Sequence, residues 1–150
     1  MDREVIELTT EDTYPLRLAV LRAGTPSNDA SFDGDDLATT FHLGVRLGGS
    51  IVAVSTWMER RYPDRPDGPG FQLRGMASGP AHRGSGLARM VLEVGIERCR
   101  QLGASLVWAR ARDEAIGFYK QHGFVVVGKG YIDLVTDLPH HDMLYEMKSL

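Results

Sequence analysis

The sequence predicts a mixed α/β fold, in which helices pack on a central β-sheet. Segments with strand alternation and segments with helical periodicity follow one another in the order β-α-β-β-β-α-β-α-β-β. A glycine pair between two apolar runs indicates an antiparallel hairpin, and an apolar stripe of helical period indicates one long helix. The length of 150 residues predicts a single domain, residues 1–150, that is large enough to bury a sizeable core.

The first half of the chain is predicted to hold four strands and one helix. The helix begins at Thr10 or Thr13, a residue type that caps helices, and runs to about Arg22. The polar, acidic segment Thr25–Asp36 follows as a loop, and a lid over a site is one interpretation of it. Gly48-Gly49 joins the second and third strands as a hairpin. The expected strands are Glu4–Leu8, His42–Leu47, Ser50–Met58 and Phe71–Ala77.

The second half is predicted to alternate helices with strands before a final pair of strands. Apolar residues at helical spacing indicate a long helix over Gly86–Leu102, which Gly103 ends. A shorter helix over Asp113–Gln121 stops before Gly123, and Gly130–His141 is expected to be a loop. The expected strands are Leu106–Ala111, Phe124–Val127 and Met143–Met147.

The composition excludes several classes of partner. A net charge of −3 and a sequence pI of about 5.9 are not typical of a protein that binds nucleic acid or an anionic membrane. No apolar run approaches the ~20 residues of a membrane span, and nothing at Met1–Glu4 begins a signal peptide. The single cysteine, Cys99, cannot form an intrachain disulfide, so we expect a cytoplasmic location.

The most informative segment is Leu73–Ala88, which has the pattern of a strand, a glycine-rich turn and the first turn of the long helix. The glycines of Arg83-Gly84-Ser85-Gly86-Leu87-Ala88 remove side chains where a phosphate would approach the backbone. The first N–H groups of a helix lack partners within the helix and carry the positive end of its dipole, so phosphate binds there. Arg83 can add a charge-assisted contact. Taken alone, such a turn is equally compatible with a loop that binds nothing.

A second motif lies further along the chain, in Ala115-Ile116-Gly117-Phe118-Tyr119-Lys120-Gln121-His122-Gly123-Phe124. With it the chain resembles the GNAT superfamily of acetyl-CoA-dependent N-acetyltransferases. The turn at Arg83–Ala88 matches the family's Gln/Arg-x-x-Gly-x-Gly/Ala pyrophosphate loop. Phe118-Tyr119 followed by Gly123-Phe124 matches the family's second signature, a short helix that ends in Gly-Phe and leads into a strand. The motifs span about Leu73 to Phe124, and the order of elements agrees over nearly the whole chain.

The resemblance implies a GNAT-type acyl-CoA N-acyltransferase fold, with a central, mostly antiparallel twisted sheet flanked by helices and with splayed middle strands. It implies that a bulged strand pairs with the pantetheine arm by main chain, here through Met76, Ala77 and Ser78. It implies that the pyrophosphate is held by Arg83, Gly84, Ser85, Gly86, Leu87 and Ala88. Tyr119 takes the position of the general acid that protonates the departing thiolate, the alternative being an aromatic that only packs its helix on the sheet. Arg112 stands where many members have an asparagine that contacts the arm.

The base that removes the proton of the attacking amine is not singled out by the sequence. An amine must be neutral to attack a thioester, and a carboxylate or an imidazole can take its proton. The candidates are Glu59 at the end of the third strand, Asp133 in the expected loop, and His140 and His141 before the last strand. Each could instead be a solvated surface residue. Adjacent histidines on an extended segment point apart, so no metal site is expected there.

Three arginines indicate the chemistry of the acceptor. Arg74 lies on the strand before the cofactor turn, and Arg110 and Arg112 share one face of the following strand because side chains alternate along a strand. Arginines that line the gap between splayed strands would bind a carboxylate or a phosphate bidentately. The equally weighted alternative is that they pair with acidic residues at the sheet edge.

These features predict an N-acetyltransferase that transfers acetyl from acetyl-CoA to the primary amine of a small, anionic molecule by direct attack in a ternary complex. Cys99 lies inside the long helix, which argues against a covalent acetyl-cysteine route. The alternatives are a non-catalytic acyl-CoA-binding or regulatory domain of the same fold, and a protein or peptide N-acetyltransferase. Many members of the family pair as dimers, so the resemblance also allows a homodimer.

Overall fold

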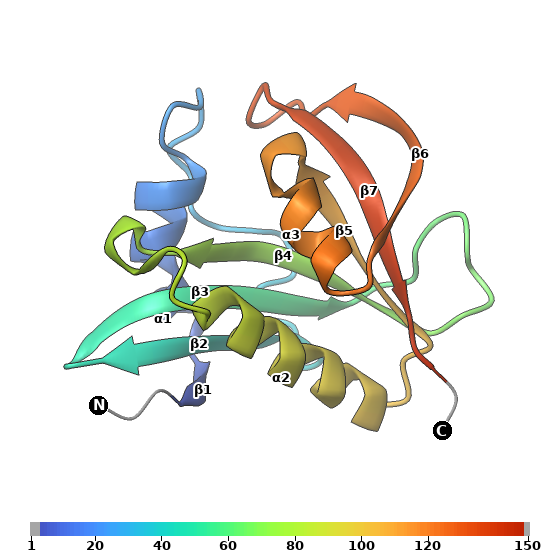
Figure 1. Cartoon of the computed structure of the whole chain (residues 1–150), viewed down its shortest axis with the longest axis horizontal. Coiled ribbons are helices and arrows are strands. Elements are labelled where there is room, and N and C mark those ends of the chain that lie inside the picture. The colour runs from blue at the N-terminus through green and yellow to red at the C-terminus, as the bar shows by residue number, and fades with distance from the viewer. Residues whose placement is uncertain (1–3, 149–150) are drawn as a thin grey trace.

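The computed structural model describes residues 4–148 and contains a seven-stranded sheet of order β1-β2-β3-β4-β5-β7-β6 (Figure 1). Neighbouring strands are antiparallel except for β4 and β5, which run parallel. Residues 1–3, which make up most of the N-terminal segment considered above, and residues 149–150 lie outside the described part of the chain. The strands are β1 (Val5–Leu8), β2 (Phe41–Leu47), β3 (Ser50–Glu59), β4 (Gly70–Ser78), β5 (Leu106–Arg112), β6 (Val125–Ile132) and β7 (Pro139–Glu146).

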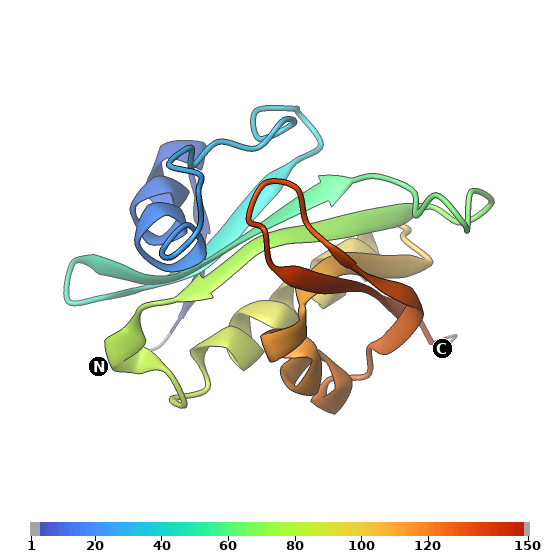
Figure 2. The ribbon, with the colours of Figure 1, turned by 90° about the horizontal axis from the view of Figure 1, so that it is seen from above.

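Helices cover the two faces of the sheet unequally. Figure 2 shows α2 and α3 on one face and α1 on the other. The helical elements are α1 (Thr10–Leu16), the π-helical turn η1 (Arg17–Leu21), the 3-10 turn η2 (Pro80–His82), α2 (Leu87–Gln101), the 3-10 turn η3 (Asp113–Ala115) and α3 (Ile116–Gln121). The core lies between α2 and the sheet, where Leu87, Val91 and Leu92 pack against Trp57 and Phe71. The predicted α/β fold with a mostly antiparallel sheet is confirmed.

The parallel pair at the centre of the sheet opens into a V. β4 and β5 are hydrogen-bonded only from Gly70 opposite Leu106 to Leu73 opposite Ala109. Beyond that point β4 continues to Ser78 and β5 to Arg112 without pairing to each other. There β4 is paired only with β3, and β5 only with β7. The expected splay of the middle strands is therefore present, and it begins at Arg74 and Arg110.

The last two strands differ from the sequence-based expectation. The predicted loop Gly130–His141 is shorter, because Tyr131 pairs with His140 and Ile132 with Pro139 in the β6–β7 hairpin. The sequence pattern is weak here for two reasons. Polar residues alternate on the face that lines a cavity, and the register shifts between Val127 and Tyr131. The loop itself is limited to residues 133–138.

The first helix reaches as far as predicted but changes geometry on the way. Thr9, rather than Thr10 or Thr13, caps it: the Thr9 side chain accepts from the Asp12 N–H, and Asp12 accepts from the Thr9 N–H. Pro15 lies within α1 and has no N–H to donate, and the π-helical turn η1 follows at Arg17. Such π-helical turns are frequent near functional sites.

Candidate active site

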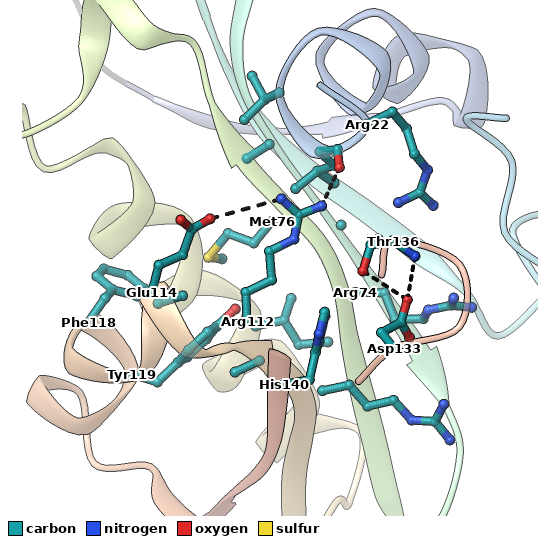
Figure 3. A pocket seen from close by; sticks show the side chains of 18 of the residues that line it. Arg22, Arg74, Met76, Arg112, Glu114, Phe118, Tyr119, Asp133, Thr136 and His140 are labelled. Atoms are coloured by element: carbon teal, nitrogen blue, oxygen red, sulfur yellow. Dashed lines mark hydrogen bonds and ion pairs between the residues drawn. The ribbon is translucent and has the colours of Figure 1, made fainter. Parts of the chain in front are cut away.

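The opening between β4 and β5 leads into a cavity of about 620 Å³. Its walls come from the free ends of both strands, from η1, from α3 and from the loop between β6 and β7 (Figure 3). The cavity brings together residues predicted for donor and acceptor. From those predictions it collects Arg74, Met76, Ala77, Ser78, Arg83, Arg110, Arg112, Tyr119, Asp133 and His140.

A bulge in β4 shapes one wall of the cavity. Thr56 pairs with Arg74 and Val54 with Ala77, so β4 carries one residue more than β3 between these pairs. Gly75 lies in the bulge with φ +60°, and a Cβ there would come within 2.7 Å of the Phe32 ring. The bulge leaves the main chain of Met76–Ser78 beside the cavity, which is the arrangement expected for pairing with a pantetheine arm.

The glycine-rich turn extends from the same wall to the start of α2. Arg83 lines the cavity, and Gly84–Ala88 continue outward from it. Gly84 and Gly86 have φ of +75° and +84°, a conformation that glycine adopts without strain. Gly86 occupies the N-cap position and offers no capping side chain, so the first N–H groups of α2 have no partner within the helix. Unpartnered N–H groups of this kind can bind an anion.

Tyr119 enters the cavity from α3. Its ring packs edge-on against Phe118 and Phe124, with centroid distances of 5.4 and 5.1 Å. Its hydroxyl has no hydrogen-bond partner among residues 4–148, and burial raises the pKa of Tyr119 to about 12. The phenol therefore keeps its proton at neutral pH and can donate it, while the ring also performs the packing role that was the alternative.

Arg74 and Arg110 lie side by side where the strands separate, and neither forms an ion pair or hydrogen bond with another described residue. Arg74 is held against the face of Phe32, with its Cζ 4.3 Å from the ring centroid. Burial, followed by the positive charges of Arg60, Arg110 and Arg17, lowers the pKa of Arg74 to about 10. Arg74 stays charged at neutral pH, so its guanidinium is a cation without a carboxylate partner in the described chain.

Arg112 spans the cavity. Its guanidinium donates to the Leu21 carbonyl oxygen of η1 and lies 4.0 Å from the Glu114 carboxylate (Figure 3). The predicted alternative of pairing with an acidic residue therefore describes Arg112 better than it describes Arg74 or Arg110. Arg22 also faces this space, and burial, followed by the charge of Arg112, lowers its pKa.

The two adjacent histidines point to opposite sides of β7. His140 is buried, lines the cavity and stacks on Tyr131 with a centroid distance of 6.0 Å. His140 Nδ1 lies 2.9 Å from the Leu138 carbonyl oxygen, which can only accept. His141 instead lies beside Gly130 and contacts Asp113 Oδ1 at 2.6 Å through its Nδ1. The structure thus brings His140 to the cavity and not His141, because alternate residues of a strand face opposite ways.

Neither predicted carboxylate base is well placed. Asp133 lines the cavity, but its Oδ2 accepts from the Val135 N–H and from the N–H and hydroxyl of Thr136 at 2.9–3.1 Å. Although burial raises its pKa, these hydrogen bonds hold the pKa of Asp133 below the ordinary value, so it is a weak base that shapes the loop. Glu59 lies at the far end of β3 opposite Phe71, at the paired end of β4, and does not line the cavity. The structure does not bring Glu59 to the reacting groups.

The polar segment 25–36 closes one side of the cavity through a buried ion pair. Arg17 and Asp35 are joined by two contacts of 2.8 Å and are almost fully buried. Arg17 also donates to the Ala30 carbonyl oxygen and the Thr56 hydroxyl, and its Cζ lies 3.9 Å from the Phe32 ring centroid. Phe32 is thus held between Arg17 and Arg74. The segment contributes Phe32 to the wall of the cavity, and the interpretation of the segment as a lid stays a prediction. The ion pair with Arg17, which lies outside the segment, carried no sequence signal.

Comparison with known proteins agrees with this geometry. A family model described as the acetyltransferase (GNAT) family matches residues 5–124. The chain belongs to the GNAT family. It is therefore an N-acetyltransferase, an acyltransferase that takes its acyl group from a coenzyme A thioester.

Among GNAT relatives, the chain is 25% identical over 143 residues to the uncharacterized N-acetyltransferase YitI of Bacillus subtilis, with 95% of each protein covered. Its fold is similar to that of Escherichia coli ElaA, with a TM-score of 0.79, 20% identity and coverage of 97% of this chain and 100% of that one. It is also similar to an acyl-CoA N-acyltransferase from Pseudomonas aeruginosa, with a TM-score of 0.76, 23% identity and coverage of 97% and 99%. No helix within residues 4–148 is long and apolar enough to cross a membrane.

Proposed function

We propose that this GNAT protein transfers acetyl from acetyl-CoA to the primary amine of a small, anionic molecule, by direct attack in a ternary complex. The observation that carries the proposal is the opening between β4 and β5. On one side lie the bulge at Met76, the anion-binding turn and Tyr119, which suit a thioester donor. On the other lie Arg74 and Arg110, two cations that suit an anionic acceptor.

The donor half of the proposed site consists of the end of β4, the glycine-rich turn and Tyr119. The main chain of Met76–Ser78 pairs with the pantetheine arm, and the turn from Arg83 to Ala88 binds the pyrophosphate, with Arg83 adding charge. Tyr119 protonates the thiolate as it leaves, which its fully protonated state at neutral pH supports. The donor is placed so that its carbonyl reaches the opening between the strands.

His140 is the base that the geometry favours. A carbonyl oxygen can only accept, so the contact with Leu138 requires the proton of a neutral imidazole to be on Nδ1. His140 Nε2 then has a lone pair, and Nε2 has no partner among the described residues. In the proposed step the substrate ammonium gives a proton to Nε2, and the amine lone pair attacks the thioester carbonyl. The new C–N bond forms, the C–S bond breaks, and the sulfur takes the proton of Tyr119. The nitrogen then gives up its second proton to the Tyr119 phenolate, which restores the phenol and leaves the neutral amide.

The test is the release of free thiol from acetyl-CoA with a panel of amines, together with mass spectrometry of the products. The panel contains neutral amines, acidic amines, a lysine peptide and a peptide with a free N-terminus. Acetylation of small acidic amines, reduced about 100-fold in Tyr119→Phe, is the expected result. Binding of acetyl-CoA without turnover of any amine would instead support a non-catalytic domain, and turnover confined to the peptides would support a protein acetyltransferase.

A further inference from the structure

A second cavity adjoins the first on the face of the sheet that α2 does not cover. It has a volume of about 420 Å³ and is lined by Arg60, Arg61, Pro63, Gln72, Arg74, Trp108 and Arg110. Gln72, Arg74 and Arg110 also line the main cavity, so the two spaces share a boundary. Four arginines and no carboxylate line the second cavity.

The floor of this cavity is fixed by packing and hydrogen bonds. Gln72 on β4 pairs with Trp108 on β5, one residue before the last paired position of these strands. The Trp108 indole N–H donates to the Arg60 carbonyl oxygen at 2.9 Å, and its ring packs against Tyr62. Arg60 is itself held by Gln72 Oε1 at 3.2 Å and by the Asp33 carbonyl oxygen at 2.9 Å. Both acceptors are neutral oxygens, so they fix the position of the Arg60 guanidinium without neutralising its charge.

No carboxylate of the described chain forms an ion pair with the arginines of this cavity. The nearest carboxylate to Arg110 in register is Asp142, directly across on β7. That carboxylate accepts from the hydroxyls of Tyr62 and Tyr131 and forms no ion pair with a guanidinium group of the described residues. Arg74 has only the face of Phe32 as a partner. An anion bound between these guanidinium groups would relieve their mutual repulsion and supply bidentate hydrogen bonds.

We propose that the second cavity binds an anionic group, a carboxylate or a phosphate, at the end of the acceptor that is remote from its amine. This inference rests on the proposed function, which places the amine beside His140. His140 pairs with Arg112, and Arg110 lies two residues earlier on β5, which separates their backbones by about 7 Å along the strand. The acceptor is therefore an extended ω-amino carboxylate or amino phosphate. An α-amino acid, whose amine and carboxylate share one carbon, is expected to be the poorer acceptor.

The first experiment compares amines of increasing length. The unbranched ω-amino acids from glycine through 4-aminobutyrate to 6-aminohexanoate are assayed with acetyl-CoA. Hexylamine, which has no anionic group, and 4-aminobutyl phosphate are assayed beside them. We expect kcat/KM to rise at least about tenfold from glycine to 6-aminohexanoate and to exceed that of hexylamine by a similar factor, since hydrogen bonds between charged groups are stronger than those between neutral groups. The phosphate and the long carboxylate, compared directly, identify the preferred anion. Equal rates for short and long acids, or for hexylamine, overturn the proposal.

The second experiment uses variants and measures binding as well as turnover. Arg61→Ala removes a charge from the second cavity without touching the main one, and it also removes the bond from Arg61 to the Pro66 carbonyl oxygen. Arg65→Ala removes an equal charge and a contact of the same loop, from an exposed arginine that is paired with Glu146 outside both cavities. We expect Arg61→Ala to reduce the preference for 6-aminohexanoate over hexylamine several-fold and Arg65→Ala to leave it unchanged. An equal effect of both variants counts against the site.

Calorimetric titration of the protein with 6-aminohexanoate and with hexylamine separates the two proposals. Selective binding of the acid that Arg61→Ala weakens, without turnover of any amine, supports the anion site and refutes the acetyl-transfer reaction. Turnover with neither selectivity nor selective binding refutes the anion site and the anionic acceptor, and leaves only the acetyl transfer standing. The absence of both turnover and binding refutes both.

Discussion

Gly95 is expected to tolerate no side chain, although it lies in the interior of a helix where alanine is normally preferred. The face of α2 at Gly95 packs directly on Trp57, and an ideal Cβ at this position would lie 1.9 Å from the ring carbon Cζ2. The ring has no room to move: its N–H donates to the Ser55 hydroxyl at 2.8 Å, it stacks on Phe41 at 5.9 Å, and it is fully buried. The substitution Gly95→Ala must therefore displace α2 from the sheet.

Two opposing effects determine how much Gly95→Ala changes the free energy of unfolding. Alanine in place of glycine favours a helix by about 1 kcal/mol. Overpacking of a well-packed core costs about 1–3 kcal/mol, and a carbon this close to a fixed ring belongs at the upper end. The net expectation is a loss of about 2 kcal/mol, which for a domain of this size lowers the melting temperature by roughly 4–8 °C.

Thermal and urea denaturation followed by circular dichroism measure this loss. Gly117 is the matched control, because it lies in α3 and no atom would be within 4 Å of its Cβ. Gly117→Ala should gain up to about 1 kcal/mol, since only the helix preference acts there. If Gly95→Ala proves as stable as Gly117→Ala, the described contact between α2 and Trp57 is wrong.

Three further predictions concern the site and the segment that closes it. Arg83→Ala should raise the KM for acetyl-CoA about tenfold with a smaller effect on the KM for the amine, as steady-state kinetics would show, because a charge-assisted contact is lost. His140→Gln should lower kcat about 100-fold, whereas His141→Gln should leave kcat within a few-fold of the wild type; equal kcat values in the two variants would remove His140 from the role of base. Asp35→Asn should cost about 3–5 kcal/mol in urea denaturation, because it leaves Arg17 buried without a counter-charge. Although burial raises it, the bonds from Arg17 hold the pKa of Asp35 below its ordinary value, so the stabilisation is complete above about pH 4 and declines as the pH falls through that lower pKa. Urea midpoints measured against pH should decline less in Asp35→Asn than in the wild type, because the variant keeps only the contribution of the other carboxylates.

The sequence predicted the fold well where apolar periodicity is strong. The long helix, the Gly48-Gly49 hairpin and the strand before the glycine-rich turn all form within one or two residues of their expected bounds. It failed at the β6–β7 hairpin, where one face of β7 carries His140 and Asp142, and His140 lines the main cavity. This part of the hairpin therefore has no apolar alternation, and the shift in register after Val127 interrupts the pattern further.

The donor half of the proposed site could be named from the sequence because its residues fall within two short motifs. Arg83–Ala88 and Tyr119 each belong to a local motif, which can be identified in the sequence without knowledge of the fold. The acceptor half is assembled from strands that are distant in sequence, so its charge balance could not be predicted. Which of the arginines lacks a carboxylate, and which of His140 and His141 faces inward, depend on strand register and on the position of Asp142.

The single parallel pair in the sheet has a consequence for how the protein can change. Because β4 and β5 run parallel, the segments that follow them begin at the same end of the two strands. These segments are the turn before α2 and the start of η3 and α3. The connection from β3 to β4, residues 60–69, lies at the opposite end of β4. It supplies Arg60, Arg61 and Pro63 to the second cavity and no residue to the main one. Exchange of this connection would alter the far end of the acceptor path and leave the thioester machinery in place. In the proposed site, the donor and the far end of the acceptor are thus bound by different segments, at opposite ends of the same two strands.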